Sequence, residues 1–138
     1  MPVRVLPDAE QVVIDYLLGQ ADVTAILGDD DRVHSQVPDE PVYPLVTVRR
    51  LGGSPVVREH LDVALLQIDC YADTKPVARD VAATILAALY DASRVSHPLA
   101  VVCDVVETRG LTWLPDTIVP SPRPRYSFDV EVKLHPIP

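Results

Sequence analysis

The stretch Arg125-Tyr-Ser-Phe-Asp-Val-Glu-Val-Lys-Leu-His135 alternates apolar and polar residues almost without a break. Because successive side chains of a strand point to opposite faces, this pattern predicts a β-strand with one buried face and one solvated face. The polar face mixes both charge signs and holds no set of groups that would converge on a substrate. Residues 114–124, just before it, are rich in proline, which favours a long loop. Together these features indicate a surface suited to contacts rather than to catalysis.

The composition limits the classes of protein to which this chain can belong. It has 138 residues, 48% of them hydrophobic, and a formal net charge of −8. One domain over residues 1–138 is expected, since domains usually span roughly 100–200 residues. The negative charge argues against a nucleic-acid binder and against an anionic membrane surface. With no bilayer-spanning apolar stretch and no secretion signal at the N-terminus, the sequence predicts a protein made in the cytosol.

Three segments carry helical signals. Asp8 is placed to cap a first helix, with Gln11 completing a capping-box pattern and Gly19 as the stop. A second, short helix is predicted over residues 22–27. Thr74 is expected to cap the main helix, and that helix's buried stripe is predicted at Val77, Val81, Ile85 and Leu89. Small residues make this helix slim enough to lie close against a sheet or a neighbouring chain: Ala82, Ala83, Ala87 and Ala88.

Runs of aliphatic and β-branched residues predict the strands. The predicted strands are residues 32–37, 45–51, 61–72, 99–109 with a continuation past a bulge at Gly110 to Trp113, and 125–135. Residues 61–72 are apolar on both faces, which predicts a central strand, and Gly52-Gly-Ser-Pro55 reads as a turn or flexible loop. The expected fold class is α+β: a single, mainly antiparallel or mixed sheet of about five strands, packed against a main helix and an N-terminal helix, in the order α-(α)-β-β-β-α-β-β.

No recognisable catalytic, cofactor or metal site emerges from the sequence. The four histidines are scattered and form no paired i, i+4 set. The run Asp29-Asp-Asp31 lacks the spacing and the later glutamate of an EF-hand. No GxSxG motif is present, and Gly52-Gly-Ser54 is too short for a P-loop. We therefore expect no enzyme, no cofactor and no bound metal.

Three strand residues carry separate expectations. Cys70 and Cys103 both fall in strand interiors and are expected to be small, buried and reduced. Asp69 lies in the middle of the central strand, between two apolar neighbours. It is expected to face the half-solvated side or to accept a hydrogen bond from a neighbour such as an arginine. The basic pairs Arg49-Arg50 and Arg123-Pro-Arg125 fit a solvated edge as well as an intersubunit salt bridge.

Several segments, taken together and in their order along the chain, form a recognisable pattern. They are Arg4-Val-Leu-Pro-Asp-Ala-Glu-Gln-Val-Val-Ile-Asp-Tyr-Leu17, Leu66-Gln-Ile-Asp-Cys-Tyr-Ala-Asp-Thr-Lys75 leading into Ala78-Arg-Asp-Val-Ala82, Gly110-Leu-Thr-Trp-Leu-Pro-Asp116, and Arg123-Pro-Arg-Tyr-Ser-Phe-Asp-Val-Glu-Val132. Their joint arrangement resembles the tail terminator (tail completion) proteins of long-tailed bacteriophages. The resemblance implies a structural role: a hexameric ring that caps the finished tail tube, stops further tube subunits from adding and offers the surface that joins tail to head.

The same resemblance implies the partners and the location. The partners would be further copies of this chain, the tail tube protein and a head-completion or neck protein. Genomic DNA would pass through the lumen without specific binding, and no membrane would be involved. The protein would be assembled in the host cytoplasm and would end in the virion, at the neck end of the tail.

Candidate contact residues lie in or beside the proline-rich loop and near the glycine turn: Trp113, Leu114, Ile118, Val119, Arg49, Arg50 and Arg58. Trp113 could equally fill the protein's own core. Ile118 and Val119 are better candidates, because a monomer gains little by exposing them. Two alternative classes remain open: another neck or tube-like structural protein, which would also oligomerise, or a small cytosolic enzyme or ligand-binding domain, which would need a deep polar-lined pocket.

Overall fold

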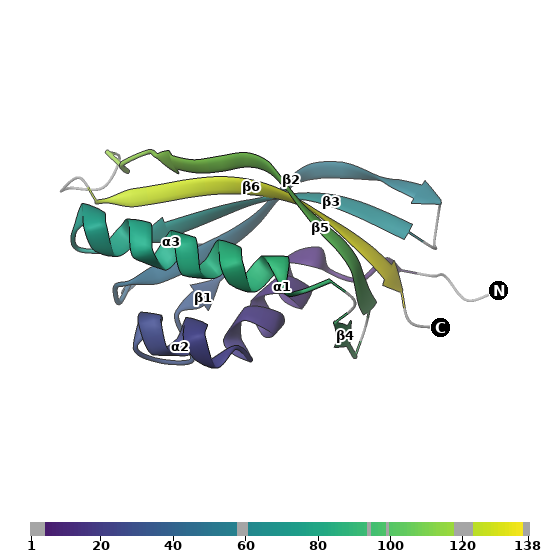
Figure 1. Cartoon of the computed structure of the whole chain (residues 1–138), viewed down its shortest axis with the longest axis horizontal. Coiled ribbons are helices and arrows are strands. Elements are labelled where there is room, and N and C mark those ends of the chain that lie inside the picture. The colour runs from purple at the N-terminus through teal and green to yellow at the C-terminus, as the bar shows by residue number, and fades with distance from the viewer. Residues whose placement is uncertain (1–4, 58–60, 94, 99, 118–122, 137–138) are drawn as a thin grey trace.

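The computed structural model describes residues 5–57, 61–93, 95–98, 100–117 and 123–136, and the side chains of 54–57 are not described. A curved sheet is covered on one face by helices (Figure 1). In chain order the elements are α1 (Ala9–Leu18), α2 (Ala21–Leu27), β1 (Val33–His34), β2 (Leu45–Val57), β3 (Leu61–Tyr71), α3 (Lys75–Tyr90), β4 (Ser96–His97), β5 (Ala100–Trp113) and β6 (Arg125–Pro136). The predicted α+β class is confirmed.

The strands form one mixed sheet in the order β1-β2-β3-β6-β5-β4. The β1–β2 pair is parallel and the other pairs are antiparallel. β3 therefore lies between β2 and β6, as its two apolar faces predicted. β1 covers only two residues of the predicted strand 32–37, and β4 is a two-residue strand that is not among the predicted ones. β4 is therefore the sixth strand, and the four long strands β2, β3, β5 and β6 lie where strands were predicted, although β2 extends beyond residue 51.

The glycine pair in β2 corrects one prediction. Gly52-Gly-Ser-Pro55 is not a turn, because β2 continues through it and stays paired with β3 up to Val57 opposite Leu61. The pairing shifts register at the glycines, from Arg50 opposite Leu66 to Gly52 opposite Leu65, as in a β-bulge. Gly53 has a φ of 106°, and a Cβ there would collide with a carbonyl of β3. The glycines thus permit a bulge and a close backbone approach inside a strand.

The helix boundaries follow the predicted caps. Asp8 accepts hydrogen bonds from the backbone N–H groups of Glu10 (3.0 Å) and Gln11 (3.3 Å), and α1 begins at the next residue. Thr74 Oγ1 accepts from the N–H of Val77 (3.4 Å) at the start of α3. In both cases a side-chain oxygen satisfies a donor that has no partner within the helix.

The core fills the space between the helices and the sheet. Its strand residues sit at alternate positions of β3 and β6 and are fully buried: Leu66, Ile68, Phe128, Val130, Val132 and Leu134. The buried stripe of α3 is Ala78, Val81, Ala82, Ile85 and Leu89. The prediction was wrong for Val77, which is 42% exposed, because Ala78 occupies the first buried turn instead.

Candidate assembly surfaces

The sheet face opposite the helices carries ordered rows of polar side chains. One row crosses four strands, from Arg49 on β2 through Gln67 and Asp129 to Arg109 on β5. Arg49 donates to Gln67 Oε1 at 3.0 Å. Arg109 makes two hydrogen bonds to Asp129, at 2.9 and 3.0 Å, and one to Ser127 Oγ at 2.6 Å. The hydrogen bond to Asp129 raises the pKa of Arg109. This arginine therefore stays charged, and its guanidinium is already bound to a carboxylate of the same chain.

Asp69 lies on the same face and behaves as the sequence predicted. It is only 6% exposed, and its two carboxylate oxygens accept from Gln67 Nε2 at 3.0 and 3.1 Å. Arg125 Nη1 lies 4.0 Å from the same carboxylate and donates to the hydroxyl of Tyr71 at 3.4 Å. Burial is the largest cause of the raised pKa of Tyr71. Arg125 of the second predicted basic pair thus serves this polar face from within the chain, whereas Arg123 pairs with Asp73 at 2.6 Å.

Arg50, one of the candidate contact residues, is engaged inside the molecule. Its guanidinium binds both carboxylate oxygens of Asp62 at 2.7 and 2.8 Å, and the Asp62 side chain is fully buried. This hydrogen bonding is the main cause of the raised pKa of Arg50. Its backbone N–H donates to the carboxylate of Glu10 in α1 at 2.7 Å. Arg50 therefore ties β2 to β3 and α1, whereas its neighbour Arg49 is exposed; Arg58 lies outside the described residues.

Trp113, the last residue of β5, and Leu114, which follows it, lie at the surface. Their exposed fractions are 38% and 42%, so the indole is neither a core filler nor fully free. The Trp113 ring packs on Tyr126, with ring centroids 5.4 Å apart, and Lys75 Nζ lies 4.6 Å from the indole centroid. The end of β5 and the start of α3 lie at the same end of the molecule (Figure 1). We call Lys75, Trp113 and the adjacent exposed Leu114 the Trp113 corner, an aromatic and cationic surface. Ile118 and Val119 lie outside the described residues.

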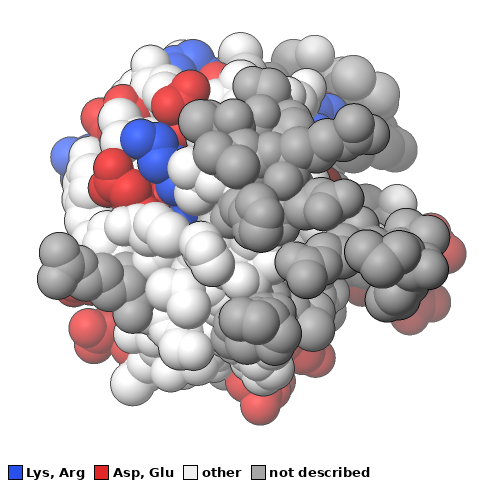
Figure 2. Space-filling view, turned by 90° about the vertical axis from the view of Figure 1, so that its right-hand side faces the viewer, with Lys and Arg blue, Asp and Glu red and all other residues white. Residues whose placement is uncertain are grey.

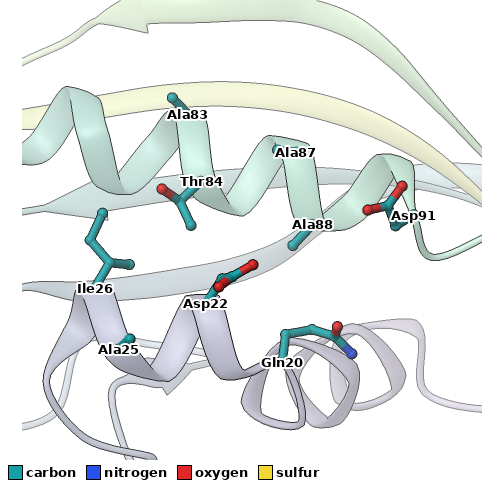
Figure 3. Close-up of a pocket in the computed structure, with 9 residues that line it drawn as sticks. All are labelled: Gln20, Asp22, Ala25, Ile26, Ala83, Thr84, Ala87, Ala88 and Asp91. Carbon is teal, nitrogen blue, oxygen red and sulfur yellow. The ribbon is translucent and has the colours of Figure 1, made fainter.

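A groove between α2 and α3 is a feature that the sequence did not predict. It has a volume of about 740 Å³. Figure 3 shows its lining residues, which are mostly small or acidic: Gln20, Asp22, Ala25, Ile26, Ala83, Thr84, Ala87, Ala88 and Asp91. The Tyr16 hydroxyl donates to the Ala88 carbonyl at 2.6 Å and so anchors α1 to this end of α3. Burial, and then the negative charge of Asp91, raise the pKa of Tyr16.

The alanines of α3 were the one signal for this groove. They indicated a slim helix, but the sequence did not show that α2 would lie beside it, because the two helices are far apart in the chain. The carboxylates of Asp22 and Asp91 stand at the groove in Figure 3, and both residues are exposed. The α2–α3 groove therefore combines small walls with negative charge.

The outer edges of the sheet are poorly suited to pairing with another sheet. Among the described residues, β5 has no neighbouring strand along its outer side from Cys103 to Trp113, yet its pairing with β6 shifts register at three places. In the described part of the chain, β2 likewise has no outer neighbouring strand beyond Thr47. There the N–H of Arg50 donates to Glu10, the glycine bulge follows, and Pro55 has no N–H. Bulges and proline are devices that keep edge strands from pairing. Both edges are thus blunted against pairing with another strand.

The two cysteines differ from each other. Both are free thiols. Cys70 is fully buried, and burial raises its pKa well above the usual value. Cys103 is exposed, so its predicted burial was wrong; it falls where the β5–β6 register skips from Val102 to Asp104, and it has no cross-strand partner there.

Among the described residues, the remaining candidate groups do not assemble into a reactive site. Asp29, Asp30 and Asp31 bring carboxylate oxygens within 4.8 Å of one another, but all three are exposed. His97 Nε2 lies 2.8 Å from a carboxylate oxygen of Asp15, in a contact between the β4 segment and α1. In the described part of the chain, no helix is long and apolar enough to cross a membrane.

Charge on the end of the molecule drawn in Figure 2 is mixed. That view looks onto the right-hand side of Figure 1, and its blue basic atoms lie next to red acidic ones, with uncharged surface between the groups. The described part of this face shows no continuous basic stripe of the kind that is typical of nucleic-acid-binding surfaces.

Comparison with known proteins gives a consistent family. The family model described as "Tail completion protein gp17" matches residues 11–117. A chain in the solved structure titled "Virion of native gene transfer agent (GTA) particle" is 19% identical, with a TM-score of 0.58 over 92% of this chain and 94% of that chain. The solved gp17 protein of bacteriophage SPP1 is 13% identical, with a TM-score of 0.54 over 96% of this chain and 95% of that one. None of the curated protein sequences matches significantly.

At such identities the two solved structures establish a shared fold, and the family rests on the sequence model. That match begins within α1, runs just past the end of β5 and includes both the α2–α3 groove and the Trp113 corner. Because it covers well over half of the sequence, the chain belongs to the tail completion protein gp17 family and is a structural protein of the bacteriophage tail, not an enzyme.

Proposed function

We propose that six copies of this chain, each contributing a single domain, form a ring that caps the tail tube, ends its polymerisation and provides the surface for head–tail joining. The observation that carries the proposal is the tail completion match over residues 11–117. The fold shared with a chain of a gene transfer agent virion over most of both chains supports a place in the particle itself. The direct partners would be the tail tube protein and a head-completion or neck protein.

Chemically different surfaces support a capping role. A tube of stacked subunits grows through heterologous contacts until a component with one matching and one non-matching face closes it. In this chain the open sheet face carries paired charges such as Arg109 and Asp129, whereas the turn that follows α2, beside the helix layer, carries the exposed carboxylates of Asp29, Asp30 and Asp31. The protein thus has two unlike faces, as a cap between a tube and a head requires.

The charge distribution supports passage of DNA without specific binding. The net charge is −8, and affinity for phosphate comes largely from lysine and arginine. Arg50, Arg109 and Arg123 are each ion-paired with an aspartate of the same chain. A lumen built from such subunits would repel a passing duplex rather than hold it.

Negative-stain imaging tests the proposal directly. The purified protein is imaged alone and with isolated tail tubes, and phage lacking the protein are examined for tail length. We expect six-fold rings at tube ends, and overlong or headless tails without the protein. A chain that stays monomeric and never associates with tubes would overturn the proposal. Binding to heads but not to tube ends would favour a different neck component.

A further inference from the structure

We infer that the α2–α3 groove of one copy receives the Trp113 corner of the next copy around the ring. The inference rests on the proposed ring and names the surfaces that would build it. The corner and the groove belong to the same chain, but they share no residue. One copy therefore offers a corner to one neighbour and a groove to the other.

The two surfaces are complementary in shape. Alanines line the groove on both helices, at Ala25, Ala83 and Ala87, and leave about 740 Å³ open. The corner presents a partly exposed indole followed by an exposed leucine. Large rigid aromatic side chains that enter pockets are typical centres of protein interfaces. Trp113 is held in place by Tyr126, so little side-chain freedom would be lost on docking.

The two surfaces are also complementary in charge. Asp22 and Asp91 place two exposed carboxylates at the groove. At the corner, the ammonium group of Lys75 lies over the Trp113 ring at 4.6 Å from its centroid. A single docking event would therefore bring an apolar group against small apolar walls and a cation towards carboxylates. Complementary charges of this kind favour the correct partner and orientation.

The position of the surfaces along α3 makes the contact intermolecular. The groove wall on α3 begins at Ala83, eight residues after Lys75. At 1.5 Å per residue this is about 12 Å along the helix. Two different patches that bind each other form a heterologous contact, and such contacts close into rings when the rotation between copies allows it. The blunted edges of β2 and β5 leave this pairing of side-chain surfaces as the better-supported route to assembly.

A charge exchange tests the pairing within the full chain. Lys75→Glu reverses the corner and Asp91→Lys reverses the groove. Both changes suit the dipole of α3, since they place an acidic group at its N-terminus and a basic group at its C-terminus, so the fold should be retained. We expect each single variant to lower the assembled fraction by about tenfold in light scattering and the double variant to recover it.

A matched control separates this effect from a general change of charge. Arg79 is a 59% exposed cation on the same helix but belongs to neither surface. Arg79→Glu should assemble like the wild type. Equal loss of assembly in this control, or no rescue in the double variant, would overturn the inference.

A mixing experiment tests the directionality of the contact. Ala87→Trp fills the groove, and Ala21→Trp adds the same bulk to an exposed alanine outside it. Ala87→Trp alone should be a monomer slightly heavier than the 15.1 kDa wild-type chain, and Ala21→Trp should form rings. In a mixture of the two variants, the Ala87→Trp chain keeps an unaltered corner and the Lys75→Glu chain keeps an unaltered groove. These two surfaces can bind each other, but the remaining corner and groove cannot. The mixture should give a one-to-one dimer and no ring; a mixture that stays monomeric would contradict the pairing.

The outcomes distinguish this inference from the proposed function. Rings that survive every groove and corner variant would refute the interface while leaving the capping role intact. Assembly that depends on these residues, in a protein that never caps tubes, would support the interface and refute the role. Variants that form normal rings but no longer bind tubes would assign the groove to the tube protein and overturn the inference.

Discussion

The two faces of the sheet are held by different physical interactions, although they are built from the same strands. Along β3 and β6, the helix-facing positions such as Ile68 and Phe128 are completely buried and apolar. One residue away, Gln67, Asp69 and Asp129 hold the open face through hydrogen bonds and ion pairs. Burial is non-directional and depends little on salt, whereas the open face depends on geometry and charge. Mutations should therefore cost most on the first face and respond most to solution conditions on the second.

The largest effect is expected on the helix-facing side. Phe128→Ala removes a fully buried ring from the middle of β6. It should lower the free energy of unfolding by about 3–5 kcal/mol, because the lost burial is combined with a cavity. Urea unfolding followed by circular dichroism measures the change. A loss below about 1 kcal/mol would mean that the core can collapse around the site.

A smaller loss is expected at the buried ion pair beside the core. Asp62→Asn removes the carboxylate that binds Arg50, whose side chain is 32% exposed. Because water can still reach the guanidinium, the cost should be about 2 kcal/mol, below the 3–5 kcal/mol of a fully buried broken pair. The same unfolding assay applies, with Asp80→Asn on the exposed side of α3 as the control. An equal loss in the control would contradict a special role for this pair.

The smallest contribution to stability is expected from the ion pair between Arg109 and Asp129 on the open face. A double-mutant cycle of Arg109→Gln and Asp129→Asn should give a coupling energy of up to about 1 kcal/mol, since both side chains are partly exposed. The coupling should shrink as salt is raised, which distinguishes it from the salt-insensitive loss at Phe128. Coupling that does not change with salt would mean that the pair is more strongly desolvated than its exposure indicates.

The reactivity of the two cysteine thiols tests the difference between a buried and an exposed position without any mutation. One thiol, that of Cys103, should react promptly with a thiol reagent in the native protein, because it is exposed. Cys70 should react only after unfolding, because it is buried and its raised pKa leaves little thiolate. Counting two thiols in denaturant and one in buffer would confirm this. Rapid reaction of both in buffer would show that the core opens readily.

The sequence predicted best where the signal is local. The alternation in residues 125–135, the Asp8 cap and the strand character of residues 61–72 all follow from neighbours in the chain, and the structure confirms them. The misses depend on partners distant in sequence. Gly52 and Gly53 were predicted to form a turn, because the sequence does not show that β3 pairs with them. Cys103 was predicted to be buried, because the sequence does not show the register shift between β5 and β6.

The candidate surfaces show the same division. The sequence singled out Trp113 and Leu114, and the structure places both at the surface, but nothing local showed that Lys75 would lie over the indole. Nor did it show that Arg50 would be tied to Asp62 rather than available to a partner. The groove needed two helices to come together from separate parts of the chain. Such features arise from tertiary packing, which single-sequence patterns do not contain.

The bulge in β2 has a consequence for how the chain tolerates mutation. Gly53 is exposed, and exposed positions usually accept most residues at little cost. Here its φ of 106° and the nearby backbone of Val63 exclude any side chain. In a saturation mutagenesis screen Gly53 should therefore score like a core position despite its exposure. Solvent exposure alone therefore does not identify which surface residues of this protein tolerate substitution.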